Sequence, residues 1–81
     1  MITINITKAI AAATTRVNSA IYQEAQHRTT KTAAGLTNVL SDVDWSTLLT
    51  TVRSQISTAT TTTQLVEAIT SIENAIQANA L

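Results

Sequence analysis

The sequence contains no cysteine, no proline and no phenylalanine, and only one glycine, one histidine, one tryptophan and one tyrosine. Without cysteine there is no disulfide scaffold and no thiolate metal site. A single glycine excludes the glycine-rich loops that hold phosphate groups. The chain has no run of about 18 apolar residues, so we expect no membrane span. Its start, MITINITKAIAAATTR, lacks the features of a secretion signal, which predicts cytoplasmic synthesis.

Charge is scarce as well. Charged residues make up 12% of the 81, and five positive and five negative side chains cancel at pH 7. The isoelectric point of about 6.5 disfavours nucleic-acid binding, which needs a basic stripe or a high isoelectric point. Hydroxyls take the place of the missing charges, with 17 threonines and 6 serines. Because 44% of the residues are apolar and the net charge is zero, we expect a folded chain rather than a disordered one.

The spacing of apolar residues predicts a first long helix over residues 7–32, ended by Gly35. Its stripe consists of Ile6, Ile10, Ala13, Val17, Ala20 or Ile21, and Ala25. Glu24 and Arg28, four residues apart, are expected to form an ion pair on the helix surface. Residues 1–6 are expected to be an extended arm. The alternation of Ile2, Ile4 and Ile6 fits either a short strand or a hydrophobic staple behind a cap at Asn5 or Thr7.

Two further helices are predicted, over residues 44–59 and 62–79. Ser41, Asp42 and Asp44 are suitable N-caps for the second, and Thr61 with Gln64 fits a capping box for the third. Between the first two long helices, helical spacing of apolar residues over 36–43 predicts either a short fourth helix or a packed connector. The fold class is therefore one all-α domain, a small three-helix bundle covering residues 1–81.

The sequence offers no residues that point to catalysis, a metal or a cofactor, so we expect a protein that is not an enzyme. His27 is the only histidine and has no close carboxylate except Glu24, one turn earlier. Asp42 and Asp44 lack the further oxygen ligands of a cation loop, and helix capping explains both. The sequence leaves open whether His27, Arg28 and Lys31 form a contact patch.

A chain this short buries little apolar surface and often obtains further stability from association. Burying an uncharged hydroxyl surface in an interface also costs less desolvation free energy than burying a charged one. We therefore expect a structural or assembly protein that self-associates or docks on a larger complex. The expected interface residues are Ile2, Ile4, Ile6, Tyr22 and Trp45, although Trp45 also fits a core position.

The small size, neutrality, lack of cysteine and abundance of threonine and alanine resemble, in composition, minor virion or accessory proteins of bacteriophages. Such a resemblance implies a virion location. The alternatives are a small regulatory or inhibitory protein that binds one host protein and, less in keeping with the charge, a weak nucleic-acid binder.

Overall fold

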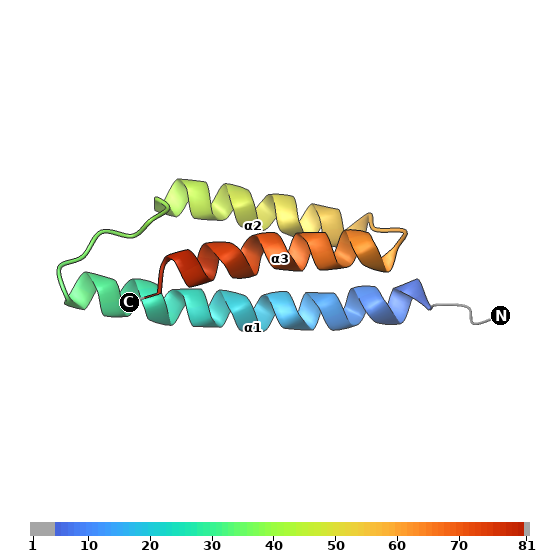
Figure 1. Ribbon diagram of the computed structural model, residues 1–81, viewed down its shortest axis with the longest axis horizontal. Coiled ribbons are helices and arrows are strands. Elements are labelled where there is room, and N and C mark those ends of the chain that lie inside the picture. Colours follow the sequence, from blue (N-terminus) through green and yellow to red (C-terminus); the bar gives the residue numbers. More distant parts are fainter. Residues whose placement is uncertain (1–4, 81) are drawn as a thin grey trace.

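The computed structural model describes residues 5–80, which form three α-helices and no strand (Figure 1). Helix α1 spans Ile6–Ala33, α2 spans Asp42–Ser57 and α3 spans Thr62–Ala78. The three helices run side by side along an elongated molecule, and α3 lies between α1 and α2 in Figure 1. Helix α3 packs against both of the others, whereas α1 and α2 touch each other little. The all-α three-helix bundle is thereby confirmed.

Each helix begins at a polar cap. The side chains of Asn5, Ser41 and Thr61 accept hydrogen bonds from backbone N–H groups in the first turns of α1, α2 and α3. Gln64 completes the capping box at Thr61 by accepting from the N–H of Thr61. The start of α2 at Asp42, two residues earlier than expected, follows from Ser41 taking the cap position.

Helix α1 ends in a Schellman motif built on Gly35, whose φ of +74° is left-handed. The N–H of Gly35 donates to the carbonyl of Thr32 at 3.1 Å, and the N–H of Leu36 donates to the carbonyl of Lys31 at 2.8 Å. Only glycine takes this conformation without a Cβ penalty. The predicted role of Gly35 as the helix stop is confirmed.

The core is an aliphatic seam to which all three helices contribute. Its buried members are Ala13, Val17, Ala20, Val52, Ile56, Ala59, Leu65, Ala68, Ile72 and Ile76. The apolar stripe of α3 is the most completely buried because that helix has a neighbour on each side. On α1 the prediction that Ala25 belongs to the core is wrong, because Ala25 is exposed and Glu24 occupies the buried position beside it.

A connector, residues 34–41, joins α1 to α2, and the short helix considered for 36–43 does not form. Two of its backbone groups bond to side chains instead of to the backbone one turn away. The N–H of Val39 donates to Asn79, and the carbonyl of Leu40 accepts from Arg28. At the other end of the molecule α1 already begins at Ile6. The question of a strand or a staple over Ile2 and Ile4 falls outside the described residues.

Candidate functional site

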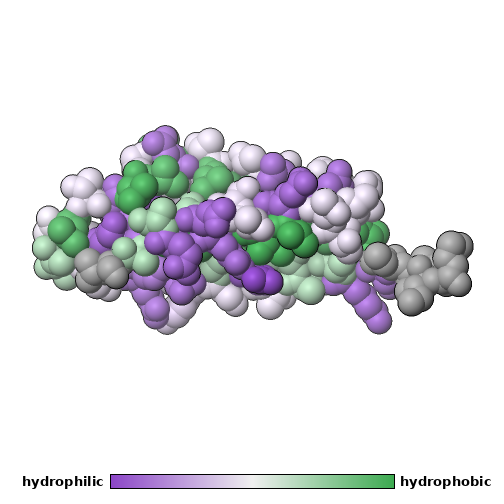
Figure 2. Space-filling view, in the orientation of Figure 1, coloured by the Kyte–Doolittle hydropathy of each residue, from purple (hydrophilic) through white to green (hydrophobic). Residues whose placement is uncertain are grey.

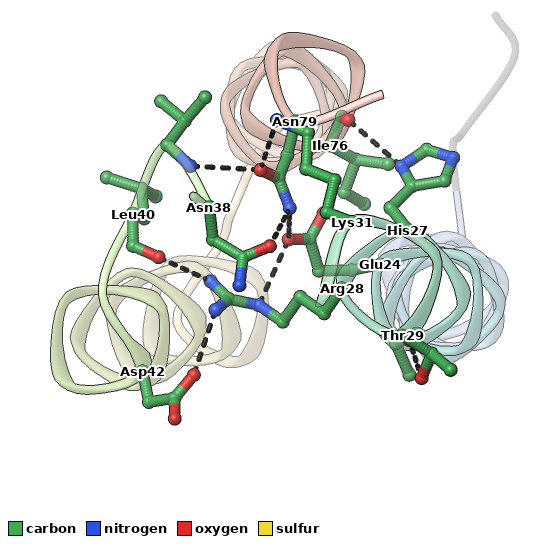
Figure 3. A network of polar contacts seen from close by, with 12 residues as sticks. Glu24, His27, Arg28, Thr29, Lys31, Asn38, Leu40, Asp42, Ile76 and Asn79 are labelled. Atoms are coloured by element: carbon green, nitrogen blue, oxygen red, sulfur yellow. Dashed lines mark hydrogen bonds and ion pairs between the residues drawn. The ribbon is translucent and has the colours of Figure 1, made fainter. Parts of the chain in front are cut away.

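Charged and amide side chains are buried where the connector crosses the end of the bundle (Figure 3). This polar cluster consists of the buried Glu24, Lys31 and Asn79 and the half-buried Arg28 and Asn38. Glu24 and Asn79 are each 2% exposed. Burying such groups is costly unless they are paired and hydrogen-bonded, so their arrangement decides whether this end of the molecule is stable.

Asn79, the C-cap residue of α3, is the centre of the cluster. Its Oδ1 accepts from the Lys31 ammonium at 3.1 Å and from the N–H of Val39 at 2.9 Å. Its Nδ2 donates to Glu24 Oε1 at 2.8 Å and to Asn38 Oδ1 at 3.1 Å. These four bonds use both donor hydrogens and both acceptor positions of the amide. One side chain thereby joins α3 to α1 and to the connector.

Glu24 lies on the core face of α1, at the spacing set by Ala13, Val17 and Ala20. Its Oε1 is 3.2 Å from Arg28 Nε, an ion pair whose geometry does not make a hydrogen bond. Its Oε2 has no hydrogen-bond partner among residues 5–80. The predicted pairing of Glu24 with Arg28 is present, but its expected position on the surface is wrong, because the carboxylate is fully buried.

Arg28 fastens α1 to the following segment. Its two terminal nitrogens donate to the carbonyl of Leu40 and to Asp42 Oδ1, each at 2.9 Å. The guanidinium also lies over the Trp45 ring, 5.8 Å from the ring centroid, within the range of a cation–π contact. Arg28 therefore holds the connector and the start of α2 against α1.

The structure does not bring His27, Arg28 and Lys31 together as an exposed basic patch. Lys31 is buried against Asn79, and Arg28 turns toward the connector. His27 is half-buried, with Nδ1 3.3 Å from the carbonyl oxygen of Ile76. A carbonyl only accepts, so this ring nitrogen is the donor. All three residues thus serve contacts within the molecule.

The expected interface residues lie in different places. Tyr22 is 70% exposed on α1, Ile6 is half-buried at the start of α1, and Trp45 is half-buried beneath Arg28 near the start of α2. Ile2 and Ile4 lie outside the described residues. The described members therefore do not form one surface, and their role in association remains a prediction.

Three exposed apolar side chains lie in the connector or at the start of α2. Leu36 is 48% exposed, Val39 58% and Val43 74%, with the carboxylates of Asp42 and Asp44 beside them. We call these five residues the connector surface. Figure 2 shows hydrophobic atoms at this end of the molecule, over the start of α2. The connector directs polar groups inward to the cluster and leaves its valine and leucine side chains facing solvent.

Sequence reasoning did not single out Asn38, Asn79, Leu36 or Val39 as site residues. A signal existed for part of the cluster, because Glu24 and Lys31 are seven residues apart and continue the spacing of the core stripe. Charged residues at core spacing indicate a buried polar contact. Nothing local to them identified Asn79 as the partner.

The described residues hold no group of three histidine, aspartate or glutamate side chains that could bind a metal ion. No helix within 5–80 is long and apolar enough to cross a membrane. Comparison of the chain with family models, curated proteins and solved structures finds no match, so neither a family nor a function can be taken from a relative.

Proposed function

We propose that this chain is a non-enzymatic structural subunit that associates with other protein chains, either copies of itself or a larger particle such as a phage virion. The observation that carries this proposal is the connector surface. Three of the five large apolar side chains that are most exposed in the described structure lie within residues 36–43. Exposed apolar side chains concentrated in one part of a surface are typical of a protein interaction site.

The cluster beneath supports the same proposal. Two hydrogen bonds of Asn79 and two of Arg28 fix the connector and the start of α2. A surface that is held rigid before binding loses less conformational entropy when it binds. The polar cluster therefore gives a docking surface a fixed shape, at the expense of burying Glu24 and Lys31.

The remaining surface suits association for a different reason. On α2 the hydroxyls of Thr47, Thr50 and Thr51 each donate to the carbonyl four residues earlier, at 3.0 Å. Their donor hydrogens are satisfied within the helix, so covering them with a partner leaves no hydroxyl donor unpaired. This face can be buried without the desolvation cost that charged side chains would carry.

Light scattering on a size-exclusion column, over a hundredfold dilution series, tests the proposal. Association predicts a mass above 8.6 kDa that falls on dilution, together with a melting temperature that rises with concentration. A constant mass of 8.6 kDa and a melting temperature independent of concentration would contradict self-association. The partner would then be a different chain, either in a larger particle or as the single target of a regulatory protein.

A further inference from the structure

We propose that two copies of this chain exchange α1, so that α1 of each copy packs on α3 of the other while the connector becomes helical. The single chain described above is called the closed chain. This inference rests on the proposed function in one respect, that copies of the chain associate, and it names the route by which they do. Because the copies are identical, the exchange reuses contacts of the closed chain and needs few new ones.

The packing of the helices allows α1 to separate from the rest of the chain. Helix α3 packs against both α1 and α2, whereas α1 and α2 touch each other little. Helices α2 and α3 are joined by the short segment 58–61 and stay together as a hairpin. The connector is the only covalent link from α1 to that hairpin (Figure 1). Helix α1 is therefore one unit of exchange, and the hairpin is the other.

The connector and the first residues of α2 carry a helical pattern that the closed chain leaves unused. Four apolar side chains fall on one face of a helix with 3.6 residues per turn, and these are Leu36, Val39, Leu40 and Val43. Three of the four are exposed in the closed chain. No proline interrupts residues 34–41. A helical connector would join α1 and α2 into one helix from Ile6 to Ser57, about 78 Å long.

A second copy covers this apolar face. Because the exchange is reciprocal, the two helical connectors run antiparallel across a two-fold axis, and the apolar face of each meets the same face of the other. When the axis passes between residues 39 and 40, residue 36 lies opposite residue 43. Asp42 then lies opposite Thr37, and Asp44 opposite Gly35, so no like charges meet.

The polar cluster contains bonds that the exchange preserves and bonds that it breaks. Asn79 bonds to Glu24 and Lys31 on α1, and these contacts form again between copies because α1 and α3 still meet. The bonds of Asn79 and Arg28 to the connector are lost, and the left-handed turn at Gly35 is released. In their place the connector makes the backbone hydrogen bonds of a helix. The cluster thus sets the balance between the closed chain and the exchanged dimer.

Cross-linking distinguishes the exchange from docking of two closed chains. The chain has no cysteine, so a pair can be introduced at chosen positions. Arg16 on α1 and Glu73 on α3 form a surface ion pair at 2.6 Å, and the exchange places these two residues on different copies. The double variant Arg16→Cys/Glu73→Cys is refolded from urea at high concentration and separated into monomer and dimer by size exclusion. Both fractions are then treated with a short bifunctional thiol reagent.

Denaturing electrophoresis should show the dimer fraction linked at twice 8.6 kDa and the monomer fraction linked within one chain. The matched control is Gln55→Cys/Glu67→Cys, at two residues that line one pocket between α2 and α3. Both control positions belong to the hairpin, so the link should form within one chain in both fractions.

Connector variants test the helical state. Gly35→Ala should strengthen dimerisation about tenfold or more, because alanine is strained in the closed turn and favours the helix. Thr70→Ala, which raises helix propensity at an exposed position of α3, is the control and should leave dimerisation unchanged. Thr37→Pro should leave only the monomer, because proline interrupts a helix. Circular dichroism checks that each variant is folded.

A wild-type chain that dimerises, with a double variant Arg16→Cys/Glu73→Cys that links only within single chains, would overturn this inference and leave the proposed function standing. Dimerisation that Gly35→Ala and Thr37→Pro both leave unchanged would also overturn it. A wild-type chain that stays monomeric at every concentration contradicts the exchange together with self-association.

Discussion

Replacing Asn79 by alanine should lower the free energy of unfolding more than the removal of any other single polar side chain. The variant loses all four hydrogen bonds of the amide. Lys31 and Glu24 then remain buried with one partner fewer each, and the N–H of Val39 loses its acceptor. Each unsatisfied buried group costs about 1–3 kcal/mol, and breaking a buried charged network costs about 3–5 kcal/mol in total.

That loss is large for a domain of this size. At about 0.05–0.15 kcal/mol per residue, 81 residues give a free energy of unfolding of roughly 4–12 kcal/mol. A loss of 3 kcal/mol should lower the melting temperature by roughly 12–24 °C. Urea unfolding followed by circular dichroism at 222 nm measures the change, and an unchanged slope against urea shows that both proteins unfold in the same way.

Two further variants separate hydrogen bonding from filling of space. The leucine side chain is close to asparagine in shape but makes no hydrogen bonds. The Asn79→Leu variant should therefore be destabilised about as much as Asn79→Ala. Asn38→Ala removes one bond from a half-buried side chain and should cost about 1 kcal/mol. If Asn79→Ala costs less than about 1 kcal/mol, or if Asn79→Leu matches wild type, the reasoning about the cluster is refuted.

The remaining predictions concern the caps and the core, each measured by urea unfolding. Gly35→Ala should lose about 1–2 kcal/mol from left-handed strain alone, because a Cβ there meets no atom within 4 Å, and a loss near zero would contradict that account. Thr61→Ala should lose about 1 kcal/mol with the capping box, and a stability equal to wild type would show that the cap is dispensable. Ile72→Ala should lose about 2–5 kcal/mol. The exposed Val66→Ala should change stability by less than about 0.5 kcal/mol, and equal losses for Ile72 and Val66 would refute the assignment of the core.

The helices could be predicted from sequence because their signals are local. The apolar stripe of α3 follows helical spacing and consists of Leu65, Ile69, Ile72 and Ile76. The predicted capping box joins Thr61 and Gln64, only three residues apart, and is confirmed. Gly35 stops α1 for a reason carried by that residue alone. Helix boundaries shifted by one or two residues, as at the start of α2, where Ser41, Asp42 and Asp44 are each able to cap.

The candidate site could not be predicted in the same way because its contacts join distant parts of the chain. Asn79 and Glu24 are 55 residues apart, and Asn79 and Val39 are 40 apart. The helical spacing of Leu36, Val39 and Val43 predicted a face that packs inward, because apolar residues at this spacing usually pack against a core. The backbone bonds of Val39 and Leu40 to Asn79 and Arg28 hold the segment out of the helical conformation instead.

The position of α3 between α1 and α2 has a consequence for how the protein is made. Helix α3 leaves the ribosome after α1 and α2, yet it supplies the surface against which both of them bury their stripes. Asn79, which closes the cluster at the connector, comes after α3 itself. Before α3 emerges, α1 and α2 have little core to share. The domain therefore gains its stability in one step, once α3 has emerged.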